Sequence, residues 1–140
     1  SRLKLELYPG VREILDYLKP HYRLAAISDG QSLWALPELR SVGLSDYFNP
    51  VLVSSDFGFR KPDSRMFEFA LAEMELAPSE VIFVGNDMYR DVWGAHAAGL
   101  KTVFFKSNQG DWKSRGVEAD YIIYNFRELP DAIRFFDHRS

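Results

Sequence analysis

The sequence has 140 residues, a formal net charge of −3 and 46% hydrophobic residues. One domain with a sizeable core is therefore expected, and the acidic balance argues against a nucleic-acid partner, which would need a basic surface. The absence of cysteine excludes disulfides, thiolate zinc sites and a cysteine nucleophile. The apolar runs are far too short to span a bilayer, so we expect a cytoplasmic protein with no membrane partner.

Short apolar runs alternate with helical patterns along the chain. Such runs, rich in β-branched and aromatic residues, are typical of strands covered on both faces, and the alternation predicts an α/β fold: a three-layer, Rossmann-like parallel sheet. In chain order we expect helix Val11–Leu18, strand Arg23–Ile27, helical stretch Gln31–Arg40, strand Val51–Ser54, helix Ser64–Glu75, strand Val81–Val84, helix Tyr89–Ala98, strands Thr102–Phe105 and Tyr121–Tyr124, and helix Pro130–Phe136.

Two of these helices carry clear internal signals. The helix that begins near Ser64 has Asp63 or Ser64 as a candidate N-cap, and its expected inward face contains Met66, Phe69, Ala70 and Met74. The helix that follows the third strand ends before Gly99, a residue that commonly stops helices.

Polar residues follow three successive expected strands. Ser28-Asp29-Gly30 ends the first strand, Lys61 lies just past the second, and Asp87 and Asp91 follow the third. In open α/β sheets the ligand binds beyond the carboxyl ends of the strands. We therefore expect these residues to converge on one rim of the sheet.

The residue types in this group suit a phosphate and a metal ion. Ser28 offers a hydroxyl donor, the turn at Asp29-Gly30 offers backbone N–H groups that bind anions, and Lys61 offers a compact positive charge. Asp87 and Asp91 are hard oxygen ligands of the kind that Mg²⁺ takes. Together they could stabilise the charge of a phosphoryl-transfer transition state.

Each residue also has an ordinary structural interpretation. A Ser-Asp-Gly sequence can form a turn that has no role in binding, and Lys61-Pro62-Asp63 can be a solvated segment that leads into a helix. Asp87 and Asp91 can simply place negative charge in the first turn of the next helix. The order of all these signals on successive strand ends favours the functional interpretation.

That order resembles the haloacid dehalogenase-like hydrolase superfamily over nearly the whole chain. Ile27-Ser28-Asp29-Gly30 resembles motif II of the family, and Gly58-Phe59-Arg60-Lys61-Pro62-Asp63 resembles motif III with its lysine. Val84-Gly85-Asn86-Asp87-Met88-Tyr89-Arg90-Asp91 resembles motif IV. The resemblance implies that Ser28 and Lys61 are catalytic, that Ser28, Asp29, Gly30 and Lys61 bind phosphate, and that Asp87 and Asp91 hold Mg²⁺.

The sequence departs from the family pattern in two ways. Asn86 stands where many members have the first acid of motif IV, which leaves open whether Asn86 or Asp87 is the first metal ligand.

No D-x-D occurs in the chain, although the family begins with this motif, whose first Asp attacks phosphorus. The interpretation is that residues 1–140 form a core domain with motifs II to IV, without the cap and without the nucleophile strand. The sheet is then incomplete at its central strand, between the Ser28 and Asp87 strands, as in a fragment, a split gene product or a trimmed form.

The resemblance implies Mg²⁺-dependent hydrolysis of a small phosphorylated metabolite when the site is complete. A non-catalytic fragment acting as a binding module, a 2-haloacid dehalogenase and a mutase stay open as alternatives. A receiver-type signalling domain, with Asp56 as phosphoacceptor and Lys106 as its lysine, lacks the required acidic pair after the first strand. Homo-oligomerisation, or pairing with a missing N-terminal segment, would cover the unpaired strand edges.

Overall fold

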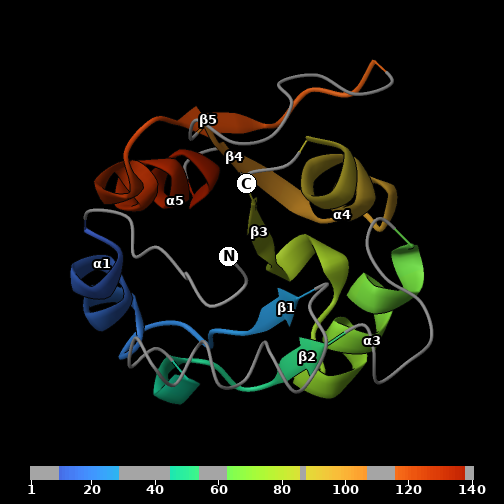
Figure 1. Cartoon of the computed structure of the whole chain (residues 1–140), viewed down its shortest axis with the longest axis horizontal. Coiled ribbons are helices and arrows are strands. Elements are labelled where there is room, and N and C mark those ends of the chain that lie inside the picture. The colour runs from blue at the N-terminus through green and yellow to red at the C-terminus, as the bar shows by residue number, and fades with distance from the viewer. Residues whose placement is uncertain (1–9, 29–44, 54–62, 86–87, 107–115, 138–140) are drawn as a thin grey trace, which may run out of the picture.

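The computed structural model describes residues 10–28, 45–53, 63–85, 88–106 and 116–137 (Figure 1). The helical elements are α1 (Val11–Leu18), η1 (Ser45–Tyr47), α3 (Ser64–Met74), η3 (Pro78–Glu80), η4 (Met88–Trp93), α4 (Gly94–Ala97), η5 (Phe126–Glu128) and α5 (Leu129–Asp137). The strands are β1 (Ala26–Ser28), β2 (Val51–Val53), β3 (Ile82–Gly85), β4 (Lys101–Phe105) and β5 (Tyr121–Ile123).

All the described strand pairs are parallel. Strand β1 pairs with β2, with Ile27 opposite Leu52, and a second sheet has the order β3-β4-β5. Within the described residues β1 and β3 belong to different sheets. The expected α/β class with parallel strands is confirmed.

Helices cover both faces of the three-stranded sheet (Figure 1). Val103 and Phe105 of β4 face one side, where they form a core cluster with Ile14 and Leu18 of α1 and with residues of α5. Between them in the sequence, Phe104 faces the other side and packs with Val92 of η4. This alternation follows from the two-residue period of a strand.

The helices α3 and α4 form the core on the opposite side. Phe67 and Leu71 of α3 pack with Ala95 of α4, and Ile27 of β1 and Phe83 of β3 both contact this cluster. The rings of Phe67 and Phe83 meet edge to face, with centroids 5.0 Å apart. The two sheets are therefore joined through one layer of helices.

Two expected elements differ in detail from the structure. The first strand begins at Ala26 rather than Arg23, since pairing starts at Ala26 and Val51 and Pro50, before Val51, has no N–H to donate. The Arg23 guanidinium donates to the carbonyl oxygens of Met74 and Asn49 at 3.1 and 3.3 Å. In α3, Phe69 was expected inside but is 38% exposed. The buried side chains are those on the stripe set by the helical period: Met66, Phe67, Ala70, Leu71 and Met74.

The segment after β3 shows the largest correction. A single helix over Tyr89–Ala98 was expected, but the chain forms a π-helix over Met88–Trp93 and then the short α4. The expected stop at Gly99 is confirmed: Gly99 has φ +88°, and the Leu100 N–H donates to the Ala95 carbonyl at 3.0 Å. The expected helical stretch Gln31–Arg40 lies outside the described residues.

Among the described residues, no helix combines the length and the apolar character needed to cross a membrane.

Candidate functional site

Two of the predicted site residues lie within the described part of the chain. Ser28 is the last residue of β1, and Asp91 lies in η4, which follows β3. The other predicted residues, Asp29, Gly30, Lys61 and Asp87, lie outside the described residues, as does Asn86. Their convergence on one rim of the sheet therefore stays a prediction.

Asp91 is held against the end of β3. Its side chain is buried, with 5% exposure, and it packs on Gly85, the last residue of that strand. A Cβ atom placed on Gly85 would lie less than 3.0 Å from the Asp91 Cβ, Cγ and Oδ2 atoms. The carboxylate thus stands at the carboxyl end of a parallel strand, the position where α/β sheets bind ligands.

The backbone around Asp91 is a π-helix, whose wider turn differs from that of an ordinary helix. Val92, the next residue, is fully buried against Phe104 of β4. The segment therefore buries two adjacent side chains, an apolar one in the core and an acidic one against the strand end. Single π-helical turns are rare and occur frequently at functional sites.

A buried carboxylate suits a hard cation. Carboxylate oxygens are hard ligands, and Mg²⁺ takes one or two carboxylates while keeping several waters. Within the described ranges, no group of three or more His, Cys, Asp or Glu side chains gathers at one point. Asp91 alone in that part of the chain matches the predicted ligand set, and Asp87 is its expected companion.

The start of α3 is fixed by Asp63, which lies two residues after Lys61. The Asp63 Oδ1 atom accepts from the Arg65 backbone N–H at 2.9 Å, which confirms Asp63 as the N-cap. The Arg65 guanidinium also forms an ion pair with this carboxylate, with Nη2 2.6 Å from Oδ2. These side-chain and backbone hydrogen bonds from Arg65 lower the pKa of Asp63 to about 2. The sequence indicated the cap but not the ion pair.

Gly85 is the site residue whose role the sequence reasoning missed. It was noted as part of a motif, but its function is spatial, because the Asp91 side chain occupies the space that any larger residue would need. A glycine at the end of an apolar strand, six residues before an acid, is the signal that could have suggested it. Glycine is the residue that allows such a close approach to the backbone.

A sequence model of the family described as haloacid dehalogenase-like hydrolase matches residues 1–105. The glyceraldehyde 3-phosphate phosphatase of Pyrococcus furiosus is 32% identical over 134 residues, which cover 94% of this chain and 55% of that protein. The crystal structure of a 2-haloacid dehalogenase from Pseudomonas syringae superposes with a TM-score of 0.82 at 27% identity, covering 95% of this chain and 55% of that one.

A further solved structure shares the fold. The HAD-hydrolase YfnB from Bacillus subtilis, bound to magnesium, superposes with a TM-score of 0.81 at 23% identity, covering 92% of this chain and 56% of that one. The chain thus spans little more than half the length of these proteins. Because the family model matches residues 1–105 of 140, the chain belongs to the haloacid dehalogenase-like hydrolase family.

Proposed function

We propose that this chain provides the core of a Mg²⁺-dependent phosphatase that hydrolyses phosphate monoesters of small metabolites. The observation that carries the proposal is the buried Asp91 carboxylate, held against Gly85 at the carboxyl end of β3. A carboxylate in that position suits a hard cation.

Each site residue has a role in this proposal. Asp87 and Asp91 would hold the Mg²⁺ ion, with the Asn86 carbonyl oxygen as an alternative ligand. When bound, the ion would neutralise charge on the phosphoryl oxygens. Ser28, the backbone N–H groups of the turn at Asp29-Gly30, and the Lys61 ammonium would bind the phosphoryl group and orient it.

The similar proteins support this choice without deciding the substrate. The Pyrococcus relative is a phosphatase of a small phosphorylated sugar by its name, and the Bacillus hydrolase was crystallised with magnesium. The Pseudomonas structure is that of a 2-haloacid dehalogenase, which makes dehalogenation the second candidate. A pair of carboxylates after β3 favours the metal-dependent reaction.

The attacking carboxylate belongs, in this proposal, to a further segment that carries D-x-D, since the 140 residues contain none. Such a segment would add a strand between β1 and β3. Ile27 of β1 and Phe83 of β3 contact one core cluster, and Leu24, two residues before β1, contacts the other together with Ile82 and Val84 of β3. A strand placed there would pair with the edges of both sheets.

Metal binding by the 140-residue chain tests the first part of the proposal. Titration calorimetry with Mg²⁺ should show weak binding that Asp91→Asn and Asp87→Asn each reduce. The matched control is Glu73→Gln, which removes an exposed carboxylate on α3 and should leave binding unchanged. Equal Mg²⁺ binding by the wild type and Asp91→Asn would remove Asp91 from the site.

Activity tests the second part. The chain alone should release little phosphate from a generic phosphomonoester with Mg²⁺, because covalent catalysis requires an aligned nucleophile. Adding a D-x-D-containing N-terminal segment should raise the rate, and Lys61→Met should abolish this gain while Lys101→Met keeps it. Robust Lys61-dependent hydrolysis by the chain alone would refute the need for the segment. Chloride release from a 2-chloro acid, without phosphate release, would favour the dehalogenase.

A further inference from the structure

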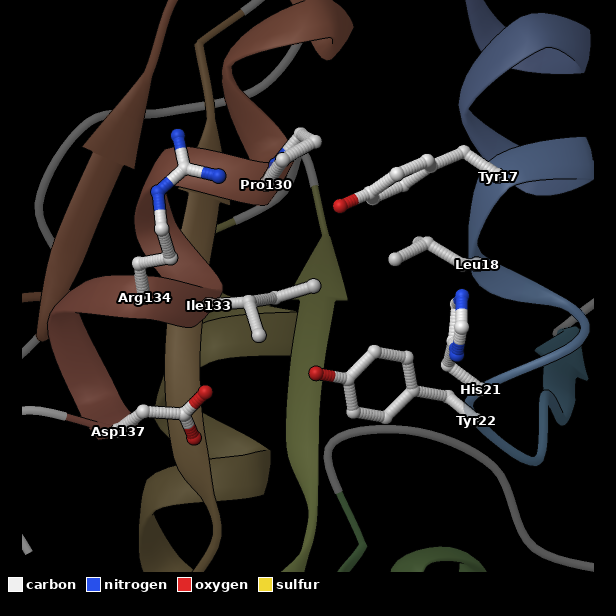
Figure 2. A pocket seen from close by; sticks show the side chains of 8 residues that line it. All are labelled: Tyr17, Leu18, His21, Tyr22, Pro130, Ile133, Arg134 and Asp137. Atoms are coloured by element: carbon white, nitrogen blue, oxygen red, sulfur yellow. The ribbon is translucent and has the colours of Figure 1, made fainter.

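The sheet β3-β4-β5 has a groove on one face and the candidate metal ligand on the other. The groove lies between α1 and α5, which cover the face of Val103 and Phe105, and it passes over β3 (Figure 2). Asp91 lies on the opposite face. It packs on Gly85, whose register partner Phe104 packs with residues of η4. The candidate metal site therefore belongs to the η4 face and not to the groove.

Lys106 comes directly after the last residue of β4 and continues its pattern. The Lys106 backbone N–H donates to the Ile123 carbonyl oxygen of β5 at 2.9 Å, so the parallel ladder extends to this residue. Successive side chains of a strand point to opposite faces, and Phe104, two residues earlier, faces η4. Lys106 therefore lies on the same face as Asp91, at the carboxyl ends of the strands.

The strand register sets the separation between Lys106 and the candidate metal site. Gly85 is opposite Phe104 on the neighbouring strand, and Lys106 follows Phe104 by two residues. With a rise of about 3.3 Å per residue and about 4.8 Å between strands, the Cα atoms of Gly85 and Lys106 lie roughly 8 Å apart. A phosphoryl group bound near Asp91 and an anion bound at Lys106 would then be separated by the length of a short carbon chain.

The ring of Tyr124 holds the Lys106 ammonium at this edge of the sheet. Lys106 Nζ lies 5.3 Å from the ring centroid, within the range of a cation–π interaction, and Tyr124 is 62% exposed. The backbone N–H groups of Tyr124 and Asn125 donate to Glu128 Oε2 at 3.0 and 2.6 Å, which fixes the chain that carries the ring. An ammonium has three N–H donors, so Lys106 can bind an anion in addition to its contacts within the chain.

We propose that Lys106 is a specificity-determining residue, which binds a second anionic group of the substrate. This role rests on the proposed function, in which the Mg²⁺ ion and the phosphoryl group occupy the site at Asp91. The preferred substrates are short phosphate monoesters with a carboxylate or a second phosphate at the other end, since a compact ammonium binds either group. Tyr124 is a positioning residue, which acts through Lys106.

The binding of three related monoesters tests the proposal. Calorimetry with the 140-residue chain and Mg²⁺ compares glycerol 3-phosphate with 3-phosphoglycerate, which has a carboxylate in place of the hydroxymethyl group, and with glycerol 1,3-bisphosphate, which has a second phosphate there. The wild type should bind at least one of the latter two about tenfold more tightly than glycerol 3-phosphate, the usual effect of one hydrogen bond between charged groups. A preference for 3-phosphoglycerate alone identifies the second group as a carboxylate, and a preference for the bisphosphate alone identifies it as a phosphate.

Substitutions of Lys106 and Tyr124 connect this preference to the two side chains. Lys106→Met should remove the preference and leave the binding of glycerol 3-phosphate unchanged, whereas Lys106→Arg should keep it. Tyr124→Leu should reduce the preference, and Tyr124→Phe should retain it because the ring remains. The matched control is Lys101→Met, at the opposite end of β4, where the ammonium also lies over an aromatic ring, 6.0 Å from the centroid of Phe136. This control should keep the preference, and thermal unfolding of each variant checks the fold.

Two results would overturn the proposal in distinguishable ways. Equal binding of all three monoesters by the wild type, or a preference that Lys106→Met retains, refutes the role of Lys106 and leaves the phosphate site in place. A chain that binds none of the monoesters and no inorganic phosphate refutes the proposed function, on which the role of Lys106 depends.

Discussion

The Asp91 side chain occupies the space that a side chain on Gly85 would need. The two residues are six apart in sequence, and the π-helix over Met88–Trp93 brings the acid back onto the last residue of β3. Asp91 is consequently buried at the strand end. Its position depends on a residue with no side chain of its own, which gives a direct way to move the carboxylate.

Gly85→Ala should displace Asp91 and weaken Mg²⁺ binding as much as Asp91→Asn does. The added methyl group would lie less than 3.0 Å from three side-chain atoms of Asp91, and forcing an extra carbon into such a contact costs about 1–3 kcal/mol. Calorimetric Mg²⁺ titration and urea unfolding measure the two effects.

Gly116→Ala is the matched control for this prediction. Gly116 has φ +75° and nothing within 4 Å of its added Cβ, so alanine should cost stability through backbone strain without altering Mg²⁺ binding. If Gly85→Ala binds Mg²⁺ as tightly as the wild type, the contact between Gly85 and Asp91 does not position a metal ligand.

Thr102→Val should destabilise the sheet by about 0.5–1.5 kcal/mol, the usual net value of a lost hydrogen bond, because the Asp120 groups left behind are exposed to solvent. The fully buried Thr102 donates to Asp120 Oδ2 through its hydroxyl at 3.1 Å and its backbone N–H at 2.8 Å, and its Oγ1 accepts from the Asp120 N–H. Valine keeps the shape but removes the hydroxyl. Thr102→Ser, which keeps the hydroxyl, should lose less stability in urea unfolding, and a larger loss for serine would contradict this account.

The sequence predicted those elements whose signals are local. The bounds of α1 agree with the expected helix, because its buried residues Ile14, Leu15 and Leu18 repeat with the helical period. The ends of strands β2 to β5 lie within one residue of the expected ends. Each strand is a continuous apolar run between polar residues, which fixes where it can begin and end. The order of the candidate site residues along successive strands follows from the same runs.

The sequence could not predict features that depend on tertiary contacts. A π-helix and an α-helix place polar and apolar residues in similar local patterns. The π-helix at Met88–Trp93 occurs together with the packing of Asp91 on Gly85 and of Val92 on Phe104. Both are contacts between different elements. The exposure of Phe69 likewise follows from where α3 meets the sheets, and apolar character alone does not fix it.

Arg23→Met should lower the free energy of unfolding by about 1–3 kcal/mol, because two hydrogen bonds are lost and each has a usual net value of about 0.5–1.5 kcal/mol. The Arg23 guanidinium joins the chain before β1 to the end of α3 and to the residue before Pro50, by donating to the carbonyl oxygens of Met74 and Asn49. Methionine keeps much of the aliphatic stem. Arg23→Lys should fall between the two in urea unfolding, because one ammonium cannot reproduce the two-directional fork. Equal stability of Arg23→Met and the wild type would show that these bonds contribute nothing.

Asp63→Asn should flatten the acid side of the stability curve. Hydrogen bonds from Arg65 lower the pKa of Asp63 in the folded chain from 3.8 to about 2. Because this folded-state pKa is depressed, the carboxylate stabilises the fold above about pH 4, and this contribution is lost as the pH falls toward about 2. Asparagine still caps the helix but does not ionise. The urea midpoint of Asp63→Asn should therefore fall less than that of the wild type between these pH values.

Glu73→Gln, on the same helix, should keep the wild-type slope. If Asp63→Asn loses stability as steeply as the wild type, the ion pair with Arg65 is not the source of the acid sensitivity.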